Sequence, residues 1–221
     1  MSPRLAFIFG RALPLGIFGF LVAIQGQLLM SGIRAALQVG VDHAAALYLV
    51  NRGLTLAFFT FIVVIYVFRG RPAASNHKFL PVAAAMVGSF ILLFIWLVPG
   101  SARSTDTTLL AASDLLLSWG VFIALFSLSY LRNRFSITPE ARGLVTTGPY
   151  AIVRHPIYLG ELMSGLGLLL PTILSAHMVV FLIFITAQLL RMHFEEAVLR
   201  RTYPEYAAYA RQTARLIPFV F

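Results

Sequence analysis

Long apolar runs separated by short polar loops restrict this chain to one broad class of fold. A helix needs about 20 apolar residues to cross the hydrocarbon of a bilayer. The runs that meet or approach this length are residues 12–31, 46–68, 79–99, 108–131, 157–175 and 177–193. We therefore expect an all-α polytopic membrane protein with about six transmembrane segments. The last two segments are shorter and are separated only by the turn at Ser175-Ala176-His177, so they predict a helical hairpin.

The composition excludes a soluble globular domain. The 221 residues are 59% hydrophobic and 11% charged, with a mean hydropathy of +0.86, whereas soluble domains carry about 25% charged residues. The formal net charge is +9, but the basic residues sit in short clusters between apolar runs, so we do not expect nucleic acid as a partner. Because the chain has no cysteine, disulfides, a thiolate nucleophile and cysteine-ligated metal sites are excluded, and we expect no metal site.

The arrangement of basic residues predicts how the chain is oriented in the membrane. They precede the first run and follow the second, fourth and sixth, whereas only Arg34, Arg52 and Arg103 fall toward the other side. The positive-inside rule therefore places both termini, the 132–156 loop and the C-terminal tail in the cytoplasm of an inner or plasma membrane. We expect the first apolar run to be retained as a span rather than cleaved as a signal peptide.

The chain divides into two predicted regions. Residues 1–131 form an N-terminal region of four transmembrane helices, and residues 132–221 carry the candidate chemistry. The tail over 193–213 interleaves charged and aromatic residues, which indicates one or two amphipathic helices at the cytoplasmic interface. Pro204 is expected to break or restart the helix there.

A first polar cluster lies in the 143–161 run, which is rich in turn formers, aromatics and ionisable groups. Pro156 suits the first turn of a helix, so Arg154 and His155 lie just before the N-terminus of the fifth span. Exposed N–H groups and the helix dipole at that point favour an anionic ligand group. Tyr158 and Glu161 are three residues apart and share one helix face.

A second polar cluster ends the sixth span. Arg191 and Glu195 are four residues apart, so a local ion pair is one interpretation, while Glu196 lies about 100° further round the helix. The short hairpin returns the chain to the side where His155 lies, which places both clusters at the same membrane boundary. A site there would take a lipid-like substrate from the bilayer and a water-soluble cofactor from the cytoplasm.

Together the two clusters resemble the isoprenylcysteine carboxyl methyltransferase family, which is related to membrane phospholipid methyltransferases. The resemblance covers residues 130–218, and its later part includes Leu199, Tyr203 and Tyr209. The basic residue and proline that end the family pattern come late here, as Arg215 and Pro218. The matching motifs are Leu144-Val145-Thr146-Thr147-Gly148-Pro149-Tyr150, Arg154-His155-Pro156-Ile157-Tyr158-Leu159-Gly160-Glu161, Arg191, Glu195-Glu196 and Glu205-Tyr206.

What this resemblance implies is S-adenosylmethionine-dependent methyl transfer to a lipophilic acceptor, at a membrane site that faces the cytoplasm. The acceptor would be an isoprenylcysteine-type carboxylate or another lipid-like carboxylate or amine, drawn from the bilayer among membrane lipids. The implied catalytic residues are Arg191, which would orient an acceptor carboxylate, with Glu195 and Glu196. The implied cofactor-binding residues are Leu144, Thr147, Gly148, Tyr150, Arg154, His155, Pro156, Tyr158, Leu159 and Glu195.

Two alternatives stay open at this point. Membrane sterol-type reductases that use NADPH carry a similar Arg-His-Pro motif and an acidic C-terminal helix, although Ile157 replaces their asparagine and Glu195-Glu196 replaces their Asp-Glu. The second alternative is a membrane binding protein without enzymatic activity that keeps the same polar residues. A transporter is disfavoured because the spans lack paired charges near the midplane and show no inverted repeat.

Overall fold

The computed structural model describes residues 5, 7–98, 104–172 and 176–218. The described part of the chain is mostly helical, which confirms the predicted all-α membrane-type fold. A short π-helical turn, Ile8–Ala12, runs into the first long helix. The α-helices are α2 (Leu13–Val39), α3 (His43–Phe68), α4 (Phe79–Phe90), α5 (Thr107–Leu131), α6 (Pro156–Leu169), α7 (His177–Thr202) and α8 (Tyr206–Gln212). Strands β1 (Ala74–Ser75) and β2 (Glu140–Ala141) pair antiparallel.

Helix length separates the predicted spans into two groups. Within the described ranges, four helical stretches are long and apolar enough to cross a membrane: Ile8–Val39, His43–Phe68, Thr107–Arg134 and His177–Thr202. The predicted spans 79–99 and 157–175 correspond to the shorter helices α4 and α6, each continued by a 3₁₀ segment, Ile91–Leu97 and Leu170–Thr172. The predicted turn residue Ser175 lies outside the described residues. The total of six spans therefore stays a prediction.

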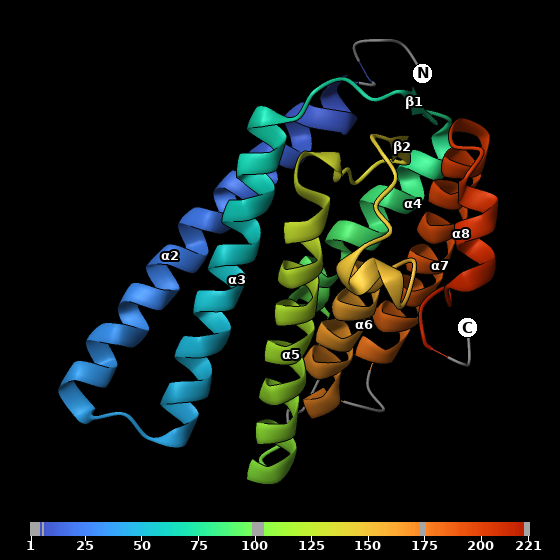
Figure 1. Cartoon of the computed structure of the whole chain (residues 1–221). Helices are drawn as coiled ribbons and strands as arrows, with labels where there is room; N and C mark the ends of the chain where they lie inside the picture. The colour runs from blue at the N-terminus through green and yellow to red at the C-terminus, as the bar shows by residue number, and fades with distance from the viewer. Residues whose placement is uncertain (1–4, 6, 99–103, 173–175, 219–221) are drawn as a thin grey trace.

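The helices alternate in direction, so that all the polar loops of interest gather at one end of the bundle. In Figure 1 the beginning of α2, the β1–β2 pair and the loop after α5 all lie at the upper end. Side chains of Asp42 and Asp106 cap α3 and α5 by accepting backbone N–H groups at the opposite end. Helix α2 packs on α3, α3 on α5, α5 on α6, and α4 on α7. This order places α6 and α7, which carry the two polar clusters, in one half of the bundle.

Helices α5 and α6 approach so closely that their backbones touch. A Cβ atom added to Gly160 would lie 2.5 Å from the carbonyl oxygen of Gly120 and 2.7 Å from the amide nitrogen of Ala124. About two turns further along, the Ser113 hydroxyl donates to the carbonyl oxygen of Gly167 over 2.6 Å. Small residues allow this kind of packing between membrane helices, where van der Waals contact replaces the hydrophobic driving force. The start of α6 is therefore held at a fixed position along α5.

The N-terminal helices are attached to the loop after α5 by buried polar contacts. The hydroxyl of Tyr66, at the end of α3, accepts the backbone N–H of Ile137 over 3.0 Å. The guanidinium of Arg69 lies 3.9 Å from the centre of the Tyr66 ring and donates to the Ser136 hydroxyl and the Gly10 carbonyl. These contacts fix the loop that leads from α5 toward α6.

The C-terminal tail differs in part from the sequence expectation. Residues up to Thr202 continue α7 instead of forming a separate interfacial helix, because the sequence from His193 onward keeps good helix formers. The break predicted at Pro204 is confirmed: α7 ends at Thr202 and α8 begins at Tyr206. The predicted start of a helix at Pro156 is also confirmed, with His155 as its N-cap residue.

Candidate functional site

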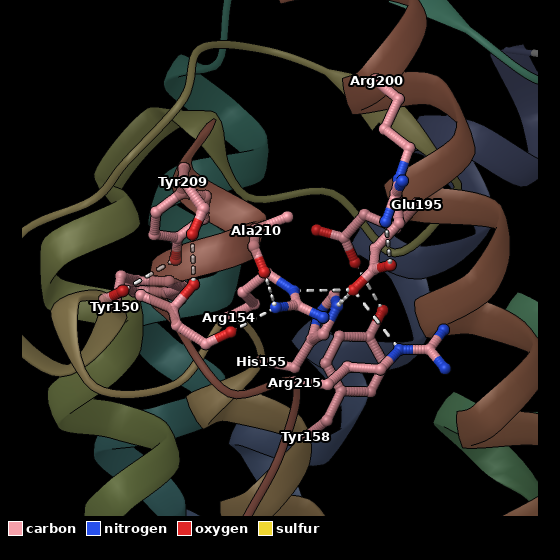
Figure 2. A network of polar contacts seen from close by, with 11 residues as sticks. Tyr150, Arg154, His155, Tyr158, Glu195, Arg200, Tyr209, Ala210 and Arg215 are labelled. Carbon is pink, nitrogen blue, oxygen red and sulfur yellow. Dashed lines mark hydrogen bonds and ion pairs between the residues drawn. The ribbon is translucent and has the colours of Figure 1, made fainter. Parts of the chain in front are cut away.

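The two polar clusters lie side by side. His155 and Arg154 directly precede α6, and Glu196 of α7 pairs with both. Figure 2 shows Arg154 and His155 within this network of polar contacts. The Glu196 carboxylate oxygen Oε1 lies 3.1 Å from His155 Nε2 and 3.0 Å from Arg154 Nε. The structure thus brings together residues about forty positions apart, in the arrangement that the hairpin predicted.

Glu196 is the centre of a network of arginine and histidine side chains. Besides His155 and Arg154, it pairs with Arg215 Nε at 3.3 Å and with Arg200 Nη2 at 3.7 Å. Its side chain is only 9% exposed. A buried carboxylate is tolerated only when charge partners and hydrogen bonds compensate its desolvation, and here several cationic side chains do so. Because its oxygens already accept several donors, Glu196 is built to hold other residues in place.

The segment after α8 completes this network. The backbone N–H groups of Arg154 and His155 donate to the carbonyl oxygens of Ala214 and Arg215, over 2.9 and 3.1 Å. The Arg154 guanidinium also donates to the carbonyl oxygens of Ala210 and Thr213. Sequence reasoning gave Arg215 no role. The sequence did carry one signal for Arg215: it is the basic residue that ends the family motif, and it comes later here than in the usual pattern.

Glu195 points to a different neighbour from Glu196. Its Oε2 accepts the Tyr158 hydroxyl over 2.8 Å, and the Tyr158 ring packs edge-on against His155 at 5.3 Å between centroids. The two adjacent glutamates are therefore divided between two tasks, as the 100° turn of a helix dictates. Glu196 pairs with arginine and histidine side chains, whereas Glu195 accepts a hydrogen bond from the Tyr158 phenol beside a cavity.

Arg191 is buried between α4, α6 and α7. Its side chain is 3% exposed, and its Nη1 donates to Glu161 over 3.2 Å and to Gln188 Oε1 over 2.6 Å. The guanidinium carbon lies 4.8 Å from the centre of the Tyr158 ring. The acidic partner of Arg191 is thus Glu161 on α6, and not Glu195 as helix spacing alone would allow, because Glu195 turns toward the Tyr158 hydroxyl.

One cavity connects these groups. Its lining includes Arg191 and six of the predicted cofactor-binding residues: Leu144, Tyr150, Arg154, His155, Tyr158 and Glu195. The other predicted residues lie around it. Gly148 has a φ of +62° and leaves no room for a side chain beside the Tyr130 ring, and Pro156 begins α6. Leu159 packs in the apolar cluster of Met192 and Leu216, and Thr147 faces a separate hollow.

Hydrogen-bonding groups without a protein partner line the same cavity. Within the described part of the chain, Tyr150 Oη, Tyr206 Oη and Arg191 Nε are buried and have no hydrogen-bond partner. Burial raises the pKa of the Tyr150 and Tyr206 phenols well above their usual range, and raises the pKa of Tyr209 to about 12. All three phenols therefore stay neutral at physiological pH and keep a proton to donate. Buried donors usually find a partner, so a ligand with acceptor atoms would complete this site.

Comparison with protein families identifies the part of the chain that builds this site. Residues 107–206 match the model of the phospholipid methyltransferase family. This segment belongs to the phospholipid methyltransferase family. That family is of the isoprenylcysteine carboxyl methyltransferase-like kind, so the resemblance drawn from the motifs is confirmed. The methyltransferase segment begins with α5 and ends at the first residue of α8. It contains the Arg154–Tyr158 corner and the Arg191–Glu196 cluster, but not Arg215.

Two curated relatives share part of the chain. Over 133 residues, which are 58% of this chain and 60% of the relative, it is 32% identical to the nickel-cobalt-cadmium resistance protein NccN of Alcaligenes xylosoxydans xylosoxydans. Over 76 residues, 34% of this chain and 35% of the relative, it is 37% identical to the cobalt-zinc-cadmium resistance protein CzcN of Cupriavidus metallidurans. The aligned segments thus span less than two thirds of either relative. No solved structure matches the chain significantly.

The far wall of the methyltransferase cavity was missed by sequence reasoning. It is formed by the loop after α5, where Ser136, Thr138, Glu140 and Arg142 line the cavity. Glu140 accepts Ser136 Oγ over 2.8 Å and pairs with Arg142 Nη2 over 2.7 Å. The sequence of this loop has no periodic pattern. A further arginine that pairs with Glu140, Arg69, comes from the end of α3, so spacing within the motif could not indicate this wall.

Proposed function

We propose that this protein is an integral membrane methyltransferase that uses S-adenosylmethionine and methylates a lipophilic acceptor at the cytoplasmic leaflet. The observation that carries the proposal is one cavity with unpartnered donors that is bordered by the Arg154-His155 corner, Tyr158 and Glu195, with Glu196 holding Arg154 and His155 from outside the lining. The family of residues 107–206 supports methyl transfer as the reaction class. The polar loops at one end of the bundle, rich in arginine, support the cytoplasmic orientation.

The cavity has the donor and acceptor groups that this cofactor requires. The cofactor carries acceptor atoms on its carboxylate, ribose and adenine, and positive charge on its ammonium and sulfonium groups. The buried hydroxyls of Tyr150 and Tyr206 and the Nε–H of Arg191 would donate to the former. The Glu195 carboxylate, held by a single phenol, would face the latter. When bound, S-adenosylmethionine supplies an already activated methyl group.

The residues of the chain then have to orient both molecules and exclude water. Glu196 fixes Arg154 and His155, so the corner before α6 is rigid before any ligand binds. Such preorganisation contributes most of the rate when the electrophile is already activated. For an amine acceptor, Glu195 is placed to receive a proton. For a carboxylate acceptor no base is required, and the Arg191 guanidinium would hold the anion.

Replacing His155 by alanine tests the cofactor assignment. His155 is 3% exposed, lines the cavity and contacts Glu196 and the Tyr158 ring. We expect calorimetric titration of the purified protein with S-adenosylhomocysteine to show affinity at least tenfold weaker for His155→Ala. His193→Ala provides the matched control, because His193 is an exposed residue of α7 that does not line the cavity. An unchanged affinity in His155→Ala, or tight binding of NADPH by the parent protein, would reject the assignment.

Gly88→Ala tests the role of Arg191. A Cβ atom on Gly88 of α4 would lie 2.6 Å from Arg191 Cδ and 3.0 Å from Gln188 Oε1. Because the arginine side chain is flexible, it would move and lose its geometry against Tyr158 and Glu161, while the backbone stays in place. We expect turnover of methyl-labelled cofactor with a membrane extract to fall about tenfold, with thermal unfolding nearly unchanged. Full turnover in Gly88→Ala would show that the position of Arg191 is unimportant.

The names of the two relatives suggest a cellular setting. Both are metal-resistance proteins by name. In the described residues of this chain, no group of three or more His, Cys, Asp or Glu is placed to hold a metal ion. We propose that any contribution of this chain to metal resistance follows from the methylated membrane component. Expression of the parent and of His155→Ala in a metal-sensitive host tests this, and equal protection by both would contradict it.

A further inference from the structure

Helix α5 carries an exposed row of aromatic side chains that the proposed reaction does not use. Trp119, Phe122, Phe126 and Tyr130 follow one another on a single face, and they are between 39% and 58% exposed. Each ring contacts the next, with centroids 5.6, 6.1 and 5.3 Å apart. Gly120 and Ala124, which pack against α6, lie on another face of the helix. The aromatic row therefore faces the lipid wherever α5 spans the membrane.

The row ends at a polar hollow at the end of α5. This hollow is bordered by Ser129, Tyr130, Leu131, Arg132, Asn133, Arg134, Val145 and Thr147. Arg132 and Arg134 are both exposed, and among the described residues neither has a carboxylate partner. Arg132 has a φ of +51°, so the chain turns sharply where α5 ends at the hollow.

The dimensions match one lipid molecule. From Trp119 to Tyr130 the helix rises about 17 Å, which is close to half of the roughly 30 Å hydrocarbon core of a bilayer and so to one acyl chain. The two arginines follow the end of the row at Tyr130, which is where the lipid phosphates lie if α5 spans the membrane. An apolar track of one leaflet's depth that ends at two guanidiniums without a carboxylate partner matches the length of an anionic phospholipid and complements its charge.

We propose that this hollow and the aromatic row form a binding site for one anionic phospholipid of the cytoplasmic leaflet. The phosphate lies between Arg132 and Arg134, which bind phosphate oxygens by charge-assisted hydrogen bonds. Asn133, Ser129 and Thr147 supply further polar contacts, and one acyl chain lies along the row on α5. The inference rests on α5 and not on methyl transfer, so it holds or fails independently of the proposed function.

The site adjoins the cavity of the methyltransferase segment. Leu131, Arg134 and Val145 border both the hollow and the cavity. Tyr130, at the top of the row, packs against Gly148, so the bound lipid contacts the loop that leads to Tyr150. A phospholipid in the hollow is therefore separated from the cavity by one layer of side chains, and it fixes that layer when bound.

Tryptophan fluorescence gives a direct test. The chain has two tryptophans, so Trp96→Phe leaves Trp119 as the only emitter, about 17 Å below the headgroup site. The full chain is reconstituted in phosphatidylcholine vesicles with increasing phosphatidylglycerol brominated at mid-chain. We expect saturable quenching at least fivefold stronger than the mole fraction of the brominated lipid predicts, and reversal by unbrominated phosphatidylglycerol. Quenching proportional to mole fraction would overturn the proposal.

Variants and lipids without the key groups sharpen the result. In Arg132→Gln/Arg134→Gln the preference is expected to fall to that of phosphatidylcholine, whereas Arg71→Gln/Lys78→Gln, an equal loss of two charges at exposed positions between α3 and α4, keeps it. Brominated diacylglycerol, which lacks the phosphate, is expected to show no preference in the parent protein. Equal enrichment of diacylglycerol would show an apolar track alone, and equal enrichment in the double variant would show that the arginines do not bind the lipid; either result overturns the site. The experiment with brominated diacylglycerol uses the parent protein, so it tests the site even if the double variant misfolds.

Discussion

Glu196→Gln is expected to weaken binding of S-adenosylhomocysteine at least a hundredfold and to abolish methyl transfer. The substitution keeps the shape of the side chain but removes the charge that Arg154, His155 and Arg215 share. Breaking a buried ion pair by removing one partner costs about 3–5 kcal/mol, because the remaining charges stay buried and uncompensated. This cost falls on the folded network. Because it releases Arg154 and His155, which line the cavity, we expect much of it to appear as lost affinity, at about 1.4 kcal/mol per tenfold.

The neighbouring glutamate provides the control for this prediction. Glu195→Gln has the same chemistry one residue away, but among the described residues the hydrogen bond of Glu195 is with the Tyr158 hydroxyl, and an amide oxygen accepts that bond equally well. We expect Glu195→Gln to unfold at nearly the parent temperature in detergent and to lose less affinity than Glu196→Gln, because only the contact of its carboxylate with the ammonium group of the cofactor is removed, with a lower turnover. Similar melting and binding in the two variants would contradict the division of roles. Insertion into the membrane is expected to be normal in both.

Gly160→Ala is expected to separate α6 from α5 and to abolish cofactor binding together with turnover. The added methyl group would lie 2.5 Å from a backbone oxygen and 2.7 Å from a backbone nitrogen of α5, and neither atom can move without its helix. Overpacking a tight interface costs about 1–3 kcal/mol, and contact with backbone belongs at the upper end of that range. Because His155 caps α6, the displacement reaches the network directly.

Thermal unfolding of the purified protein measures this second effect. Gly53→Ala is the matched variant, since Gly53 lies inside α3 with no atom near the position of a new Cβ. Alanine is about 1 kcal/mol better than glycine in a helix interior, so Gly53→Ala is expected to leave the melting temperature unchanged or slightly raised. If both variants melt like the parent, the close approach of α5 and α6 does not determine the position of the corner.

The sequence predicted the parts of this fold that depend on local pattern. Apolar run length predicted the long helices, Pro156 predicted the start of α6, and Pro204 predicted the break after α7. The hairpin argument also placed His155 near Glu196. Helical phase predicted that two adjacent glutamates would face different neighbours, which the structure shows.

Contacts that depend on tertiary packing could not be read from spacing. Arg191 pairs with Glu161 of another helix, and Gly88 of α4 makes room for it, yet nothing near Gly88 in the sequence indicates an arginine 103 positions later. Arg215 reaches Glu196 because the segment after α8 runs beside residues 153–155. The cavity wall formed by the loop after α5 was missed for the same reason. Its Glu140 pairs with Arg142 of the same loop, but also with Arg69 from the end of α3.

The cavity has two walls of unlike construction, and this difference bears on how such an enzyme changes its substrate. On one wall α6 lies backbone to backbone on α5 and Glu196 is surrounded by cations, so almost any replacement disturbs several contacts at once. The opposite wall belongs to the irregular loop after α5, where Ser136 and Glu140 hold Arg69 and Arg142. Directed evolution toward a new acceptor should therefore randomise other lining positions of that loop, such as Thr138 and Val145, and leave Ser136, Glu140 and the helical wall intact. Natural variants with new acceptors are expected to differ at the same positions.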